Sequence, residues 1–424
     1  MHNPISTYRQ TFRHFSRNAR LYLISNIIQG LVFSIYMLFF NLFILARGFE
    51  KDFLGFLTAI PSFVGLVFAF PAGAISDRIG HRRAMMLGTL LSALPVAGIV
   101  LLTDKAWMSA LYVVFGCART LTMVSSSPFL MENSTPQERT SLFSASFGLS
   151  TLVGFFGNLI GGLLPAIFAI LLSVDTESVP AYQGTLWVVV GLSLAAVIPL
   201  ALIREEERIE PLSSVPSLPG VPANAPLPFK LIGKLLLPNA IISIGAALLI
   251  PYMNVFFKEK FPIPDSVLGA VFSVSSVAMG LATLTSPMLA GRMGKIRALV
   301  LTQLISIPFL LAIGFAPWLG LAMVAFWIRA ALMNMGSPLY NAFAMEQVDE
   351  RARARVSSLM GMGWNIGWSV GPYLSGLMQV RVGFSPIFLI TAGTYLAGSI
   401  MPYVFFAKTD PVPGRTASGD PKLL

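Results

Sequence analysis

Charged residues are scarce in this sequence. Asp, Glu, Lys and Arg make up 11% of the 424 residues, whereas about a quarter of an ordinary soluble domain is charged. Hydrophobic residues reach 55%. Many uncharged windows extend over about 20 residues, which is long enough for a helix to cross a hydrocarbon core of about 30 Å. The composition therefore indicates an integral membrane protein.

Cysteine and histidine are also rare. Cys117 is the single cysteine, so no intramolecular disulfide can form. The histidines, His2, His14 and His81, form no metal-ligand cluster. The sequence has no glycine-rich nucleotide loop, and the serines near Ser125 have no His or Lys base within their run. We therefore expect a protein that is not an enzyme and needs no metal or cofactor.

The formal net charge is +10, but the basic residues do not suggest nucleic acid. No basic stripe interleaved with aromatic residues is present. The basic N-terminal arm runs into a long apolar stretch without a small-residue cleavage site, so we expect no removable signal peptide. The expected partners are a small-molecule substrate and the lipid bilayer, without nucleic acid, and the protein is expected to be a monomer.

Apolar runs between charged or Pro/Gly-rich segments predict an all-α membrane protein with about twelve transmembrane helices. Six precede the centre of the chain and six follow it. The predicted spans are 21–46, 53–76, 84–103, 107–131, 141–172, 185–203, 235–257, 266–290, 298–315, 318–345, 356–380 and 385–407.

The centre of the chain divides it into two predicted domains. Residues 1–203 form an N-terminal six-helix bundle with a basic arm, and residues 235–407 form a C-terminal bundle. Residues 204–234 contain six prolines and a charged cluster, which is typical of a linker. Residues 408–424 form a polar tail.

The distribution of Lys and Arg predicts the topology. If both termini and the linker share one side, that side carries 21 of the 29 Lys and Arg residues and the opposite side carries 6. By the positive-inside rule, the termini and linker are expected to be cytoplasmic. Together with the short loops, this favours a prokaryotic inner membrane.

The two halves of the chain resemble each other at an offset of roughly 212 residues. CARTLTMVSSSPF in span four matches WIRAALMNMGSPL in span ten, which aligns Arg119 with Arg329. Asn41 similarly aligns with Asn254, and Asn26 with Asn239. Two parallel six-helix halves joined by a long loop are typical of transporters, whose substrate site lies near the midplane between the halves.

The loop Gly73-Ala-Ile-Ser-Asp-Arg-Ile-Gly-His-Arg-Arg83 resembles the signature loop between helices two and three of the major facilitator superfamily. His81 departs from the usual Lys or Arg. The resemblance covers the whole chain and implies transport by alternating access between two six-helix bundles. It also implies a conformational latch on the cytoplasmic side, formed by Gly73, Asp77, Arg78, Gly80, Arg82 and Arg83.

Residue chemistry supports that interpretation of the loop, although a role in insertion and topology alone stays open. Gly73 permits close helix packing, Gly80 permits a tight turn, and the arginines favour the cytoplasmic lipid surface. Asp77 is the one acid, and a carboxylate is stabilised at a helix N-terminus. The second half has Gly291 at the position of Asp77, so any latch is asymmetric.

Glycines repeat at close spacing in spans five and eleven. The segment from Gly154 to Gly162 resembles a superfamily motif that accompanies export, but Asn158 replaces its proline. The fuller Gly-Pro form lies in span eleven, from Gly367 to Gly376. Small residues at this spacing let helices approach closely, which suits either a sliding interface or plain packing.

Arg119 and Arg329 are the only basic residues inside predicted spans. An arginine at the midplane costs at least about 2.5 kcal/mol and usually faces a partner or an aqueous cavity. No acid lies mid-span to pair with either one. The absence of mid-span carboxylates and histidines also disfavours an internal proton relay, which leaves uniport, anion exchange or coupling through Glu132 or Glu346.

In the superfamily, helices one, four, seven and ten line the cavity, so the resemblance implies two guanidinium groups facing the substrate path. This geometry predicts an organic or inorganic anion as substrate. The alternatives are a coupling role for Arg119, efflux of drug-like amphipathic compounds, or a transporter-fold sensor without net transport. The candidate substrate-binding residues are Arg119, Arg329, Asn26, Gln29, Tyr36, Asn41, Tyr252, Asn254 and Asn365.

Overall fold

The computed structural model describes residues 15–204, 229–348 and 350–407, and these residues are helical with short connections and no strand. The N-terminal half contains α2 (Arg17–Ala46), α3 (Lys51–Ile79), α4 (His81–Leu101), α5 (Lys105–Glu132), α6 (Pro136–Leu172), α7 (Val179–Ala195) and α8 (Val197–Ala201). The C-terminal half contains α9 (Phe229–Leu249), the 3-10 turn η1 (Ile250–Tyr252), α10 (Met253–Lys260), α11 (Asp265–Met293), α12 (Lys295–Phe315), α13 (Leu319–Glu346), α14 (Glu350–Val382) and α15 (Ser385–Phe406).

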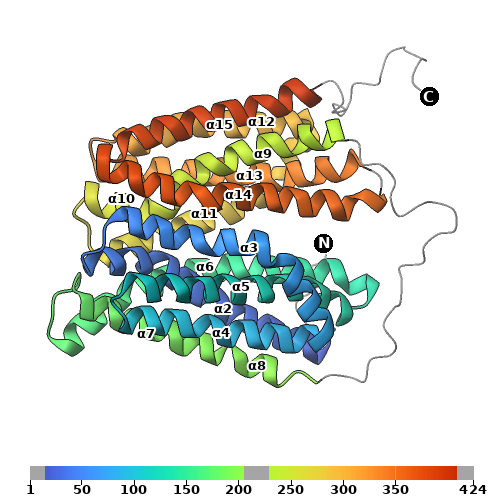
Figure 1. Ribbon diagram of the computed structural model, residues 1–424. Coiled ribbons are helices and arrows are strands. Elements are labelled where there is room, and N and C mark those ends of the chain that lie inside the picture. Colours follow the sequence, from blue (N-terminus) through green and yellow to red (C-terminus); the bar gives the residue numbers. More distant parts are fainter. Residues whose placement is uncertain (1–14, 205–228, 349, 408–424) are drawn as a thin grey trace, which may run out of the picture.

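The predicted architecture of about twelve spans in two bundles is confirmed. Within the described residues, 11 helical segments are long and apolar enough to cross a membrane. Helix α14 is less apolar but has 33 residues, and it packs along α3 and α9. In Figure 1 the helices of each half run side by side as one bundle, and the two bundles lie next to each other.

Several helix boundaries differ from the prediction for local chemical reasons. Helix α9 begins at Phe229, before the predicted start of span seven at 235, and the rest of the predicted linker, residues 205–228, lies outside the described residues. The same span is interrupted by η1, because Pro251 has no N–H to donate to the preceding turn. The predicted tail, residues 408–424, is also outside the described residues.

Two equivalent turns show the internal repeat in the backbone. Gly80 separates α3 from α4 with φ +89°, and Gly294 separates α11 from α12 with φ +88°. Positive φ is accessible to glycine at little cost. A single-residue turn of the same conformation therefore recurs at the same place in both halves.

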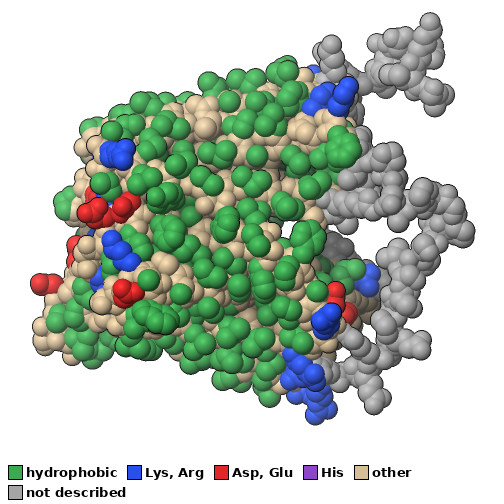
Figure 2. All heavy atoms as spheres, viewed as in Figure 1, with side chains coloured by type: hydrophobic (Ala, Val, Ile, Leu, Met, Phe, Trp, Pro, Cys, Tyr) green, Lys and Arg blue, Asp and Glu red, His purple; other side chains and the backbone are tan. Residues whose placement is uncertain are grey.

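The bundle has two ends, which we name by what they carry. The linker end is where α2 begins, α8 ends, α9 begins and α15 ends; the far end is the opposite one (Figure 1). Figure 2 shows Lys, Arg, Asp and Glu side chains gathered at the two ends, with a wide hydrophobic band between them. This distribution is the one expected for a chain that spans a bilayer.

Close glycine contacts join the halves toward the far end. A Cβ atom built on Gly162 of α6 would lie 2.8 Å from the Gly269 Cα atom of α11. At the second interface between the halves, a Cβ atom on Gly55 of α3 would meet the Pro372 carbonyl group of α14. Gly269 follows Gly55 by 214 residues, so the two interfaces are equivalent contacts of the repeat.

Asn158 occupies the place of the motif proline without losing this contact. Its backbone carbonyl oxygen faces Gly269, as that of Pro372 faces Gly55. Its side-chain amide also donates to Ser276 Oγ at 3.3 Å. The interface is therefore built by backbone atoms and small residues, which tolerate the exchange of proline for asparagine.

Ion pairs reinforce the far end. Lys51 Nζ of the N-terminal half lies 2.7 Å from Glu259 Oε2 of the C-terminal half. Lys258 Nζ lies 2.5 Å from Glu177 Oε1 across the interface and 3.0 Å from Asp265 Oδ1. The far end is thus closed by packing, hydrogen bonds and charge.

Candidate functional site: two cavities in the linker-side half

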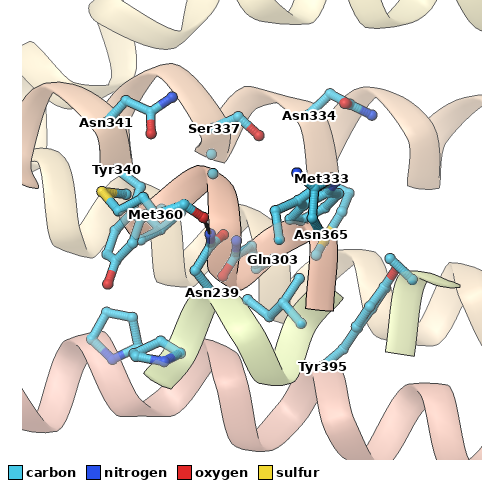
Figure 3. Close-up of a pocket in the computed structure, with 18 of the residues that line it drawn as sticks. Asn239, Gln303, Met333, Asn334, Ser337, Tyr340, Asn341, Met360, Asn365 and Tyr395 are labelled. Atoms are coloured by element: carbon cyan, nitrogen blue, oxygen red, sulfur yellow. Dashed lines mark hydrogen bonds between the residues drawn. The ribbon is translucent and has the colours of Figure 1, made fainter. Parts of the chain in front are cut away.

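A cavity of about 620 Å³ lies inside the C-terminal bundle and extends from the middle of α13 toward the linker end. Figure 2 shows a notch between the two halves at this end. The side chains that line the cavity are amide-, hydroxyl- and sulfur-rich, and Figure 3 shows side chains from α9, α12, α13, α14 and α15 converging on it. They include Asn239, Gln303, Arg329, Met333, Asn334, Ser337, Tyr340, Asn341, Met360, Trp364, Asn365 and Tyr395.

Helical spacing places these groups together. Arg329, Met333 and Ser337 follow one another at four-residue intervals, so they share one face of α13. Gly336 on the same helix leaves room for α12, because a Cβ atom there would lie 3.2 Å from Gln303 Nε2. Because Gly336 has no side chain, the Gln303 amide can lie beside it and reach the cavity wall.

Arg329 is held by the protein. Its side chain is 5% exposed, and its Nη2 atom donates to the Tyr395 hydroxyl oxygen at 2.5 Å. The guanidinium carbon lies 5.4 Å from the centroid of the Tyr395 ring. Its Nε atom has no hydrogen-bond partner, so one N–H donor is unused.

Three primary amides on the cavity wall make no side-chain hydrogen bond with the part of the chain described: Gln303, Asn341 and Asn365. By contrast, Asn334 donates to the Ala330 carbonyl oxygen at 2.8 Å. The free amides can each donate and accept. The wall therefore presents unused donors and acceptors together.

A second cavity of about 270 Å³ lies in the N-terminal bundle and contains Arg119. The Arg119 guanidinium carbon lies 5.9 Å from the centroid of the Phe33 ring. Within the described residues this side chain makes no hydrogen bond or ion pair, and it is exposed to the cavity. The polar lining also includes Gln29, Tyr36, Thr89, Ser92 and Thr122.

The two arginines therefore line separate cavities. Met123 is the residue that contributes to both linings. No Asp or Glu is among the described residues that line either cavity. Arg119 makes no hydrogen bond to the described residues, whereas Arg329 donates one to Tyr395.

Of the other predicted substrate-binding residues, Gln29, Tyr36 and Asn365 line a cavity. Gln29 also donates to Ser25 Oγ at 3.1 Å, and the Tyr36 hydroxyl group bonds to that of Tyr112. These residues combine a cavity position with a contact inside the bundle.

The remaining four predicted residues bond within the protein. Asn26 donates to the Ser146 hydroxyl oxygen at 3.1 Å. Tyr252 is fully buried and donates to the Pro372 carbonyl oxygen at 2.7 Å. Asn41 and Asn254 bond to each other across the interface at 3.1 Å. In this conformation their side chains join helices.

The predicted latch loop lies at the linker end. A Cβ atom on Gly73 would meet nothing within 4 Å, so the expected close packing is absent in this conformation. Asp77, Arg78 and Arg83 are exposed. Arg82 instead donates to the Leu200 and Ala201 carbonyl oxygens, at 3.0 and 2.7 Å, where α8 ends.

His81, the departure from the superfamily loop, is tied to the N-terminal half. Its Nδ1 atom lies 2.8 Å from Ser76 Oγ, and its Nε2 atom lies 3.3 Å from Glu132 Oε1. Lys295 and Glu346 make the equivalent pair in the C-terminal half. Both acids at the inner edge of the bundles are therefore paired within their own half.

Four polar residues of the larger cavity were not predicted from the sequence: Gln303, Asn334, Asn341 and Tyr395. Gln303 was detectable, because it is an amide inside the apolar span 298–315, where an unpartnered amide is costly. Tyr395 gave no comparable signal, since its contact with Arg329 spans 66 residues of sequence.

Comparison with known families agrees with this architecture. The sequence model of the Major Facilitator Superfamily matches residues 22–248 and 235–423. These are the two six-helix halves, and transporters of this class are membrane carriers without enzymatic activity. The chain belongs to the Major Facilitator Superfamily.

Curated relatives include drug transporters. The chain is 27% identical over 347 residues to the multidrug efflux pump Tap of Mycolicibacterium fortuitum, covering 76% of this chain and 80% of Tap. It is 23% identical over 399 residues to the multidrug resistance protein MdtG of Dickeya zeae (strain Ech586), covering 90% and 92% of the two chains.

Solved structures share the fold. The nucleoside transporter NupG superposes with a TM-score of 0.74 at 14% identity, covering 92% of this chain and 99% of NupG. The inward-facing, unoccupied bacterial homologue of the human lysosomal transporter Spinster gives a TM-score of 0.69 at 16% identity, covering 92% and 94%.

Proposed function

We propose that this transporter carries a small organic solute with an anionic or acceptor group across the membrane by alternating access. The observation that carries the proposal is the pair of linker-side cavities, each with an arginine and neither lined by an acid among the described residues. Arg119 supplies the free charge for the anionic group, and Arg329 with Asn365 binds on the opposite bundle. A guanidinium fork suits carboxylate, sulfate and phosphate oxygens.

In the proposed transport cycle, the far end opens while the linker end closes. The far end is closed by Lys51–Glu259, Lys258–Glu177 and the glycine interfaces. Opening it separates these contacts while the bundles rock and the linker end closes. The loop containing Gly73, Asp77, Arg78, Gly80, Arg82 and Arg83 then serves as the latch of the linker end.

The proposed orientation places the linker end in the cytoplasm of a prokaryotic cell, in the inner membrane. The excess of Lys and Arg on that side supports this orientation. Transport is proposed to be uniport or exchange, because Glu132 and Glu346 are held by His81 and Lys295 outside both cavities.

Efflux of drug-like amphipathic compounds is the second candidate. The names of Tap and MdtG favour it, and the larger cavity also offers Met333, Met360 and Trp364 as an adaptable apolar wall. The two candidates differ in whether transport requires the charge of Arg119.

Flux in proteoliposomes tests the proposal. Uptake and efflux of benzoate, sulfate and a lipophilic cationic dye are measured with and without a pH gradient, for wild type, Arg119→Gln and Arg329→Gln. The control is Arg381→Gln, because Arg381 is exposed in the last turn of α14 at the far end. Organic-anion flux lost in both cavity variants supports the first candidate. Dye flux independent of Arg119 supports the second, and anion flux unchanged in both variants contradicts the two-arginine site.

A further inference from the structure

The larger cavity offers matched donors and acceptors, which an inorganic anion cannot use. Sulfate and carboxylate groups present only acceptor oxygens. Gln303, Asn341 and Asn365 present carboxamides whose donor and acceptor atoms have no partner in the described part of the chain. An acceptor-only ligand would leave the buried Gln303 Oε1 atom unmatched, and an unmatched buried polar atom is costly.

Gln303 has a buried amide oxygen that an acceptor-only ligand would leave without a hydrogen bond. The residue is 7% exposed, and its Oε1 atom is buried without a hydrogen-bond partner. Its last side-chain torsion joins an sp³ to an sp² carbon, and such torsions are broad. Rotation about this bond can therefore present either the oxygen or the NH₂ group to the cavity without strain.

The guanidinium group in this cavity is partly engaged. One N–H of the Arg329 Nη2 atom donates to Tyr395 at 2.5 Å, and its buried Nε atom has no hydrogen-bond partner. Arg119, which has no hydrogen-bond partner among the described residues, lies in the other cavity. The more available guanidinium group and the unpartnered amides therefore lie in different bundles.

From this geometry, we infer that the C-terminal cavity binds the part of the cargo that carries an adjacent N–H and C=O, as in a primary carboxamide, a lactam or a cyclic imide, attached to a flat apolar body. A carboxamide side chain pairs with such an edge through two parallel hydrogen bonds, one donated and one accepted. Trp364, Tyr340 and Met360 supply the apolar wall for the flat body. The inference rests on the proposed transport function and narrows its cargo.

Three probes of nearly the same shape test the inference. Benzamide carries the donor and acceptor, N,N-dimethylbenzamide lacks the donor, and acetophenone is a neutral acceptor-only isostere of benzamide. Binding of each probe to the purified full-length protein is measured by ligand-observed NMR titration. Benzamide is expected to bind about tenfold more tightly than either of the others, the equivalent of one lost hydrogen bond.

Substitutions of the cavity amides test whether these side chains cause the preference for benzamide. Gln303→Leu and Asn365→Leu are each expected to remove the preference for benzamide. Gln183→Leu is expected to retain it, because Gln183 lies on α7 outside both cavities and donates to the Val100 carbonyl oxygen at 3.2 Å. The Gln183→Leu variant also controls for the general effect of losing an amide on stability.

Four outcomes would each overturn the inference. They are equal binding of benzamide and N,N-dimethylbenzamide, equal or tighter binding of acetophenone, absence of binding by all three probes, and a benzamide preference that survives both cavity substitutions. The proposed function fails separately. If organic anions are carried in an Arg119-dependent manner while the benzamide preference is absent, the transport proposal stands and only the amide-edge inference is wrong.

Discussion

Asn41 and Asn254 bind each other across the interface of the two bundles in a nearly symmetric arrangement. Asn41 Nδ2 donates to Asn254 Oδ1 at 3.1 Å and to the Pro251 carbonyl oxygen. Asn254 Nδ2 donates to the Leu38 carbonyl oxygen at 2.8 Å. Each amide thus reaches a carbonyl group three residues before the other asparagine. Because both residues are almost fully buried, these hydrogen bonds must break when the far end opens.

Loss of this pair is expected to favour opening of the far end. Hydrogen bonds between membrane helices contribute about 0.6 kcal/mol each on average, so Asn41→Leu, which removes two, should shift the closed-to-open ratio by about eightfold. The distance between spin labels at Trp107→Cys and Trp318→Cys, in a Cys117→Ser background, reports this ratio. Gln183→Leu should leave the distance distribution as in wild type. An unaltered distribution in Asn41→Leu would show that the pair does not hold the far end closed.

Lys258 is expected to be the most important charge of the far end for stability. The Asp265 side chain is 3% exposed and depends on Lys258 for a counter-ion. Removing one partner of a buried pair costs about 3 to 5 kcal/mol, so Lys258→Met should lower the thermal unfolding temperature strongly. Lys51→Met removes a pair whose acid is 45% exposed and should cost less than about 1 kcal/mol.

The double variant Lys258→Met, Asp265→Asn should recover much of the lost stability, because the buried carboxylate is then removed. If Lys258→Met and Lys51→Met lower the unfolding temperature equally, or the double variant is no better than the single one, the buried ion pair is not the cause.

The two arginines should differ in their effect on folding. Arg329→Gln leaves the fully buried Tyr395 hydroxyl group without its donor, which is expected to cost about 1 to 3 kcal/mol. Arg119→Gln breaks no hydrogen bond to the described residues and should leave the unfolding temperature nearly unchanged. Thermal unfolding of the purified variants measures both effects. A larger loss in Arg119→Gln than in Arg329→Gln would contradict the assignment of free and held guanidinium groups.

Gly162 is expected to be required for closure of the far end. A side chain there overlaps the α11 backbone at Gly269, so Gly162→Leu should lengthen the distance between the far-end labels. Gly191→Leu is the matched control, since a Cβ atom at that helical position meets nothing within 4 Å. The same short distance in Gly162→Leu as in wild type would show that this interface is not a closing contact.

The fold was largely predictable because it depends on patterns that extend over whole spans. Hydrophobic length, the repeat that aligns Arg119 with Arg329, and the loop around Gly80 each indicated the two-bundle transporter. The break at Pro251 and the start of α9 at Phe229 depend on single residues, so the boundaries were less accurate.

The site was less predictable because it depends on side-chain direction and on the conformational state. Asn41, Tyr252 and Asn254 lie on the helices expected to line a cavity, yet each bonds to neighbouring helices in the closed far half. Gln303 lies on α12, a helix that the resemblance did not implicate. The position of a residue in the sequence indicates its depth in the membrane. It does not indicate which group its side chain bonds to.

Accessibility of a single cysteine in the larger cavity tests the central claim most directly. Ser337 lines the cavity and is exposed, so Ser337→Cys in a Cys117→Ser background places a thiol beside the proposed cargo. A membrane-impermeant maleimide should label this thiol from the linker side, and a transported solute should slow the labelling in proportion to its occupancy. A thiol that is unreactive from that side, or a labelling rate unaffected by a saturating transported solute, would contradict transport through this cavity.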